Sequence, residues 1–216
     1  MSPPGNGKPG GADAATSLAK ADAAAKASPT AAATVGTVQE CPLSGVKVEG
    51  SAEFKAKTLA ALKEIQATKS GAALLADLKQ SGKTITIKET AGGNECGGFN
   101  KAALVKADGK PGSGSNSTVS FNPDRANIGA EDWQKRPPAV GLAHELVHAS
   151  HAANGTVDLK SVDNDSRPDP ADPEKMVQEK QEEVRTAGIP PYDKEPFSEN
   201  SIRAEWSPKQ PARPWY

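Results

Sequence analysis

Residues 139–151 read AVGLAHELVHASH, a run that contains all three histidines of the 216-residue chain. His144 and His148 are four positions apart. On an α-helix they therefore lie on one face, about one turn from each other, and can direct two ring nitrogens at a single ion. Glu145 is rotated by about 100° from His144, which lets it reach a water on that ion without being a ligand. The spacing predicts a helix that binds a metal ion.

The surrounding sequence predicts that this helix is buried, which argues against a chance match on an exposed helix. Pro137-Pro138 can open the first turn, and Asn154-Gly155 can end the helix with a left-handed residue. Buried imidazoles need polar partners, and a metal ion supplies them. The motif is embedded in the apolar residues Val140, Leu142, Ala143, Leu146, Val147 and Ala149.

The motif also predicts a type of chemistry. A Zn²⁺ ion held by three protein groups keeps a position for a water, whose pKa falls to about 7. Glu145 would take a proton from that water and later deliver it to the leaving amine. This is metal-assisted hydrolysis of an amide bond.

The composition predicts one folded domain preceded by a disordered segment. The chain has 20 glycines and 18 prolines but only 4% aromatic residues, which indicates a small core with long irregular connections. Residues 1–40 consist mainly of Ala, Gly, Ser, Thr and Pro, and no aromatic residue occurs before Phe54. Such a segment buries too little apolar surface to offset its ordering entropy. It is either a plain flexible tail or an unstructured secretion leader, and residues 41–216 form the predicted domain.

Charge and hydropathy exclude two classes of partner, and the cysteine content excludes a disulfide framework. The formal net charge is −1 and no basic cluster occurs, so we expect no nucleic-acid partner. No apolar run approaches the length of a membrane span, so we expect no membrane partner either. Cys41 and Cys96 are too few for a disulfide framework, and free thiols are expected.

The residues before the motif predict an α+β fold with a small sheet next to the metal-binding helix. Ser51 is a plausible N-cap for the first helix, and a second helix runs from Ser70 to Gly82. Strand patterns occur at residues 84–88, 118–121 and, more weakly, 99–106. The first helix carries Phe54, Leu59, Leu62 and Ile65 at helical spacing.

A third metal ligand is expected on a helix after the motif. We expect a solvated acidic loop at residues 163–170, and then a helix from Asp172 to Ala187 that opens with Asp-Pro-Glu. At 100° per residue, Glu183 borders the apolar side of that helix, whereas Glu182 faces solvent. Glu183 is therefore the preferred third ligand.

Three other candidates fit less well. His151 is on the same stripe as the pair but about 4.5 Å beyond His148 along the axis, which suits a place behind the ligands or facing the substrate. Asn154 occupies the position at which metzincins have a third histidine, so that class is excluded. Asp158 resembles an aspzincin residue, but it follows His148 so closely that little chain is left to turn back.

The C-terminal residues look too specific for a simple tail. Residues 198–206 read SENSIRAEW, which predicts a short capped helix, and the chain ends with RPWY. Arg213 and Tyr216 could place a guanidinium and a phenol against the oxyanion that forms when water attacks the carbonyl. One such donor typically lowers the barrier by about 2.7 to 4 kcal/mol. The alternative is an aromatic end that only packs against the domain.

Four motifs in this order resemble the NleD-type zinc metallopeptidases, which are type III secreted effectors of Gram-negative pathogens. They are HELVHA at 144–149, EExxT at 182–186, ENxIR at 199–203 and RxxY at 213–216. The resemblance covers roughly residues 41–216. It implies a compact gluzincin-like fold, one Zn²⁺ ion, and endopeptidase activity on proteins of the host cytoplasm. It also implies that the leader is an export signal.

The resemblance extends to substrate class and to the last motif. Understood members of the family cut mitogen-activated protein kinases, so a host kinase is one expected substrate. The ending RxxY is also similar to clostridial neurotoxin light chains, whose Arg and Tyr stabilise the transition state; this implies catalytic roles for Arg213 and Tyr216. We expect a monomer. His151 matches no known requirement of the family.

Two other functions remain open at this point. One is a deformylase-like metallo-amidase that uses Cys96 as a ligand, although the residues around Cys96 depart from the usual Glu-Gly-Cys-Leu sequence of those enzymes. The other is a non-catalytic interaction protein whose metal is structural.

Overall fold

The computed structural model describes residues 39–40, 46–105, 108–158, 160–169 and 172–215. The predicted leader at residues 1–40 lies almost wholly outside these ranges, as do Cys41 and Tyr216. Among the described residues, no helix has the length and apolar character that crossing a membrane requires.

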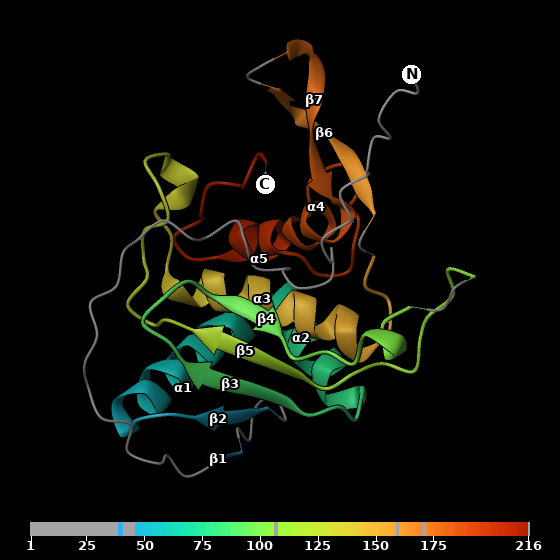
Figure 1. The fold of residues 1–216 in the computed structure, drawn as a ribbon. Coiled ribbons are helices and arrows are strands. Elements are labelled where there is room, and N and C mark those ends of the chain that lie inside the picture. The colour runs from blue at the N-terminus through green and yellow to red at the C-terminus, as the bar shows by residue number, and fades with distance from the viewer. Residues whose placement is uncertain (1–38, 41–45, 106–107, 159, 170–171, 216) are drawn as a thin grey trace, which may run out of the picture.

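A mixed five-stranded sheet forms the base of the fold, with the order β1-β2-β3-β5-β4 (Figure 1). Strand β2 pairs in parallel with β3, and β3 in parallel with β5. The short outer strands β1 and β4 pair antiparallel with β2 and β5. The strands are β1 Gln39–Glu40, β2 Lys47–Glu49, β3 Ile85–Glu89, β4 Glu95–Gly97 and β5 Ser117–Phe121.

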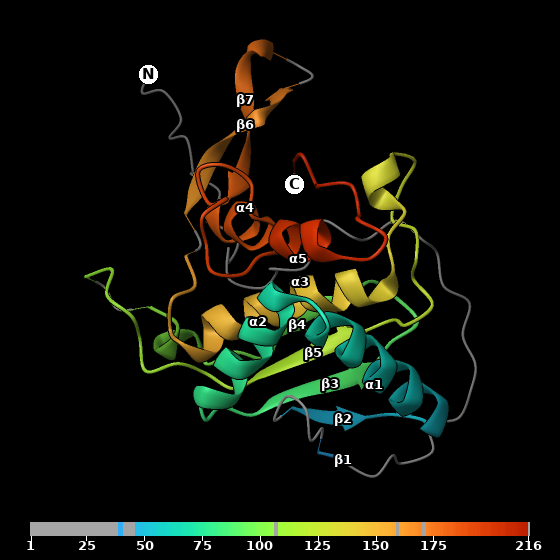
Figure 2. The same cartoon turned by 180° about the vertical axis from the view of Figure 1, so that it is seen from behind.

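Two helices, α1 (Ala52–Gln66) and α2 (Lys69–Gln80), cover the side of the sheet that faces the viewer in Figure 2. The Ser51 hydroxyl accepts a hydrogen bond from the Phe54 amide, so the predicted N-cap of the first helix is confirmed. Apolar side chains of both helices, the sheet and α3 share one core. The α+β fold class is therefore confirmed.

Helix α3 (Pro138–Ala153) contains the histidine motif. It lies between strands β4 and β5 on one side and helices α4 (Gln181–Ala187) and α5 (Glu199–Glu205) on the other (Figure 1). Pro138 occupies its first position, and Gly155 follows its end with φ of 67°, as the sequence predicts. Every residue from Ala139 to Ala153 is buried. Because the helix is enclosed on all sides, each of its polar side chains needs a partner within the protein.

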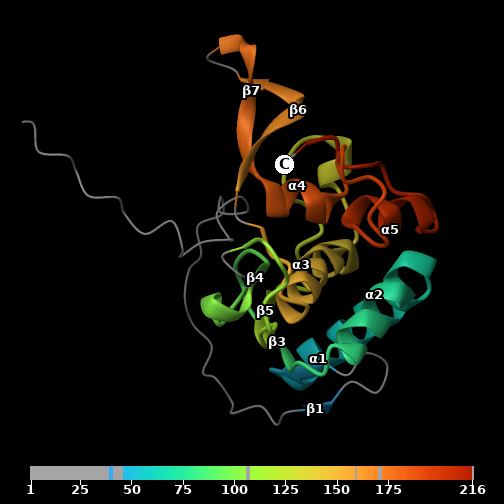
Figure 3. The same cartoon turned by 90° about the vertical axis from the view of Figure 1, so that its right-hand side faces the viewer.

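The segment after α3 differs from the prediction. Residues expected as an acidic loop and the start of a helix form a hairpin, β6 (Ser161–Asp169) and β7 (Asp172–Lys180), which projects from the body (Figure 3). Helix α4 begins only at Gln181 and runs to Ala187. The start predicted from Asp-Pro-Glu was wrong. Residues 172–180 contain few apolar side chains, so a helix there would have had no apolar stripe to bury.

Smaller elements also depart from the prediction. The weak strand pattern at residues 99–106 was wrong, because the Asn100 side chain accepts from the Ala102 amide and caps a 3₁₀ helix at Lys101–Ala103. Strands β2 and β4 were not predicted. A second 3₁₀ helix, Asp132–Gln134, precedes α3, and α5 (Glu199–Glu205) is the predicted short helix, capped by Ser198.

Candidate metal centre

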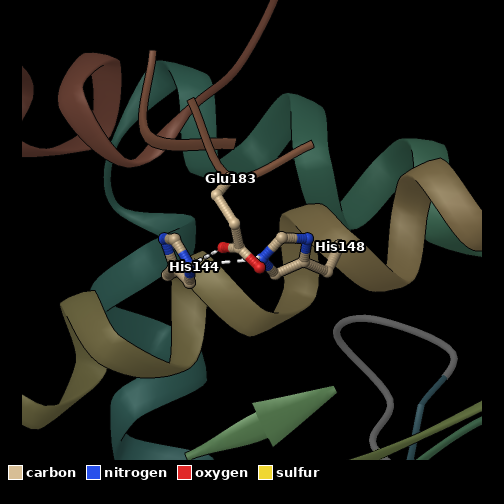
Figure 4. A group of neighbouring side chains, drawn as sticks. All are labelled: His144, His148 and Glu183. Atoms are coloured by element: carbon tan, nitrogen blue, oxygen red, sulfur yellow. Dashed lines mark hydrogen bonds and ion pairs between the residues drawn. The ribbon is translucent and has the colours of Figure 1, made fainter. Parts of the chain in front are cut away.

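Three predicted residues converge between α3 and α4 (Figure 4). His144 and His148 project from successive turns of α3, and Glu183 reaches down from the first turn of α4. The two Nε2 atoms are 3.2 Å apart. The Glu183 Oε2 atom lies 3.0 Å from the His148 Nε2 and 3.5 Å from the His144 Nε2. All three side chains are buried.

These separations fit a shared divalent ion. Ligand atoms about 2.0–2.1 Å from a tetrahedral Zn²⁺ lie about 3.3 Å from one another. The observed distances of 3.0, 3.2 and 3.5 Å bracket that value. Two imidazole nitrogens and one carboxylate are also a donor set that zinc prefers. The residues therefore fit the ion that the motif implies.

The far ring nitrogens fix the orientation of both imidazoles. The His144 Nδ1 lies 2.8 Å from Glu199 Oε2, and the His148 Nδ1 lies 3.1 Å from Glu182 Oε1. An ionised carboxylate can only accept, so each Nδ1 carries the proton and donates it. Each Nε2 is then the ring nitrogen available to coordinate an ion. Carboxylates behind metal-binding histidines hold them in this way.

Glu182 is the clearest correction to the sequence analysis, which placed it in solvent. Its side chain is fully buried and contacts four groups. Oε1 accepts from His148 and, at 2.6 Å, from the Nδ1 of His151; it also lies 3.4 Å from the Thr186 hydroxyl. Oε2 accepts from the Asp158 amide at 3.2 Å. The solvent-facing position predicted for Glu182 was wrong because the apolar side of its helix was defined partly by residues 172–180, which form strand β7.

Charge in the centre favours a cation. Burial alone would raise the pKa of the Glu182 carboxyl, but the imidazoles of His151 and His148 outweigh it and lower this pKa to about 2. Burial also opposes ionisation of Glu183, and the two neighbouring histidines again lower its pKa. Burial would lower the pKa of His148, but the Glu183 and Glu182 carboxylates outweigh it and raise that pKa well above its usual range, so the centre attracts positive charge.

Glu199 is the residue that the sequence analysis missed, although it lies in the quoted motif ENxIR. The carboxylate accepts from His144, from Arg203 Nε at 2.8 Å and from Arg213 Nη1 at 3.2 Å. Arg136 Nη1 lies 3.7 Å away. Burial alone would raise the pKa of the Glu199 carboxyl, but the guanidiniums of Arg213 and Arg136 outweigh this effect and hold the pKa well below its usual range. The available signal was the four-residue spacing of Glu199 and Arg203 on one helix face.

Arg213 is held rigidly beside this carboxylate. Its guanidinium lies over the Trp133 ring at 5.0 Å, and its Nε donates to the Trp215 carbonyl at 3.0 Å. The Trp133 and Trp215 rings meet edge to face at 5.0 Å. The Arg213 amide also donates to the Asn200 side chain. Arg213 therefore approaches the centre through Glu199, whereas its predicted partner Tyr216 lies outside the described residues.

Glu145 and Cys96 lie near the centre without joining the converging group. Glu145 follows His144 on α3 and is buried. Cys96 is buried in β4, where burial first, and then the nearby Glu145 carboxylate, raise the pKa of its thiol well above its usual range. Among the described residues, the group that can hold an ion is His144, His148 and Glu183, so the Cys96 alternative loses its support.

Sequence comparison matches residues 43–216 to Peptidase_M91, a family described as effector protein. The chain belongs to the Peptidase_M91 family. This is a peptidase family, and the NleD-type resemblance of the four motifs is confirmed. No curated protein sequence is significantly similar to this Peptidase_M91 chain.

Solved structures from Clostridium botulinum are similar to part of this Peptidase_M91 fold. The light chain of neurotoxin serotype F aligns with a TM-score of 0.43 and 17% identity, covering 62% of this chain and 43% of that chain. A structure of the catalytic domain of the same serotype gives 0.35 and 18%, with coverages of 50% and 38%. The chain thus spans less than half of the length of either toxin structure.

Proposed function

We propose that this chain is a zinc-dependent endopeptidase that cuts a protein of the host cell. The observation that best supports the proposal is the convergence of two imidazole Nε2 atoms and one carboxylate at the spacing of zinc ligands. His144, His148 and Glu183 would hold one ion. When bound, zinc would supply Lewis acidity and lower the pKa of a water.

Glu145 would move the proton of the reaction. Its carboxylate accepts a proton from the attacking water, whose oxygen forms the new bond to the carbonyl carbon. It then delivers that proton to the amine nitrogen as the carbon–nitrogen bond breaks. The burial of Glu145, which follows His144 on α3, supports this role because it keeps the carboxylate away from bulk water.

Arg213 and Tyr216 would stabilise the oxyanion that forms during the attack. The support for Arg213 is its fixed position, since Glu199, Trp133 and the Trp215 carbonyl all hold the guanidinium. Preorganised donors of this kind need no rearrangement during the reaction. For Tyr216 the support is the resemblance of the RxxY ending.

The substrate would be an extended segment of a host protein, and family resemblance favours a kinase. Strand β4 is the last strand of the sheet and contacts α3, so its outer edge offers backbone groups to an added strand. Residues 1–40 would direct export by a type III system, and the enzyme would act as a monomer in the host cytoplasm. The effector description of the family supports this destination.

The test compares the wild type with Glu145→Ala. The variant should keep one zinc per chain, measured by elemental analysis, because Glu145 is not a ligand. Its turnover should fall by at least about 100-fold, the usual contribution of a positioned general base. New protein termini in host-cell lysate, identified by mass spectrometry, report cleavage and name the substrate.

Two outcomes would overturn the proposal. Loss of zinc from Glu145→Ala would refute the division of roles between Glu145 and the ligands. Retained zinc with identical termini in both lysates would leave the metal a structural one in a non-catalytic interaction protein.

A further inference from the structure

The third histidine of the motif is buried in the same helix but does not face the ion site. His151 is only 5% exposed, and its Nδ1 lies 2.6 Å from Glu182 Oε1. Neither the family resemblance nor the metal-binding spacing assigns it a function. The hydrogen bond from this buried imidazole to a fully buried carboxylate needs a structural or functional explanation.

The same oxygen of Glu182 serves both histidines. Oε1 accepts from His151 Nδ1 at 2.6 Å and from His148 Nδ1 at 3.1 Å. The other oxygen, Oε2, accepts from the Asp158 amide at 3.2 Å. The carboxylate is thus held at four points, because Oε1 also lies 3.4 Å from the Thr186 hydroxyl, and its contact with Nδ1 orients His148.

We propose that His151 is a positioning residue for the metal centre, which acts on His148 through Glu182. Its shorter hydrogen bond fixes the rotation of the Glu182 carboxylate. Glu182 in turn keeps the proton of His148 on Nδ1, so that its Nε2 would be available to the ion held with Glu183 and His144. This chain of contacts rests on the zinc site proposed above and explains why the motif continues from HExxH to a histidine three residues later.

The geometry explains why a second anchor is needed. Glu182 and the ligand Glu183 are neighbours on a seven-residue helix, and both contact the same imidazole from opposite nitrogens. Without His151 the carboxylate would keep His148, the Asp158 amide and the more distant Thr186 hydroxyl. It could then turn about its side-chain bonds, and His148 would turn with it. Partners behind a metal ligand typically change metal affinity by about 10 to 100-fold when removed.

Zinc affinity of the full chain, measured by competition with a chelator of known affinity, tests the proposal. His151→Leu removes the donor but keeps the bulk, and it should weaken zinc binding by about 10-fold or more. His151→Asn places an amide N–H near the position of the lost Nδ1–H, and it should keep the affinity within about 3-fold. A residue that only fills space would show the reverse order, because leucine fills the site better than asparagine.

Two further variants separate positioning from stability. Ser150 precedes His151, and its hydroxyl donates a partly buried hydrogen bond to Asp77 on α2, which is not part of the converging group. Ser150→Ala should therefore lower the melting temperature without changing zinc affinity. Glu182→Gln should weaken zinc binding, and adding His151→Leu to it should cause little further loss, because both act through one carboxylate.

Equal zinc affinity of wild type and His151→Leu would refute the positioning role while leaving the proposed function intact. Full additivity of the affinity losses caused by His151→Leu and Glu182→Gln would refute it in the same way. Failure of the wild type to bind zinc would instead refute the proposed function itself.

Discussion

Replacing Glu199 by glutamine should destabilise the fold far more than the small change of shape suggests. Arg203 is fully buried, and its Nε and Nη2 lie 2.8 and 2.7 Å from Glu199 Oε1. Removing one partner of a buried ion pair costs about 3 to 5 kcal/mol, because the other charge is left uncompensated. A glutamine carbonyl still accepts one hydrogen bond, so we expect the lower value, about 3 kcal/mol. For a domain of about 150–250 residues this corresponds to a fall in melting temperature of about 6 to 12 °C.

Calorimetry of the metal-free protein measures this effect without a contribution from zinc binding. The matched control is Glu205→Gln on the same helix, where the carboxylate is exposed and accepts from the Ser70 amide and hydroxyl. The loss of stability in Glu205→Gln should stay near or below about 1 kcal/mol. A fall of less than about 2 °C for Glu199→Gln, or equal falls for the two variants, would refute the view that Glu199 neutralises the buried arginines.

Two more predictions concern the ligand set and the leader. Glu183→Ala should lose zinc in elemental analysis whereas Cys96→Ala should retain it, because only the first removes a converging donor; the opposite pattern would revive the metallo-amidase alternative. Deleting residues 1–38 should change the melting temperature by less than about 2 °C, since a segment of this composition buries little apolar surface. A large fall in that experiment would make the segment part of the folded domain.

The sequence predicts the metal-binding helix well because its determinants are local. Proline at the start, glycine after the end and the four-residue histidine spacing act within one element, and the same is true of the Ser51 and Ser198 caps. Glu183 was placed beside the buried face although its helix is shorter than expected. Its neighbour Glu182 was misplaced, because the reference face came from residues that pair across the hairpin.

Residues that depend on distant partners could not be read from the chain. Glu199 lies 55 positions from His144, and Arg213 contacts Trp133, which lies in the 3₁₀ helix before α3. Nothing local marks such pairs, since charged residues on short helices are usually solvated. Strand β4 was equally hidden, because its three residues form a strand only by pairing with β5.

The projecting hairpin has a consequence for how relatives are found. Its two ends are adjacent, since Ser161 pairs with Lys180 and the Gln181 amide donates to the Lys160 carbonyl at 2.7 Å. The interval of 35 positions from His148 to Glu183 therefore includes a hairpin whose two ends lie side by side. Lengthening or trimming that arm would alter the interval between the ligands in the chain but not in space. Searches that fix this interval would overlook enzymes whose arms differ only in reach.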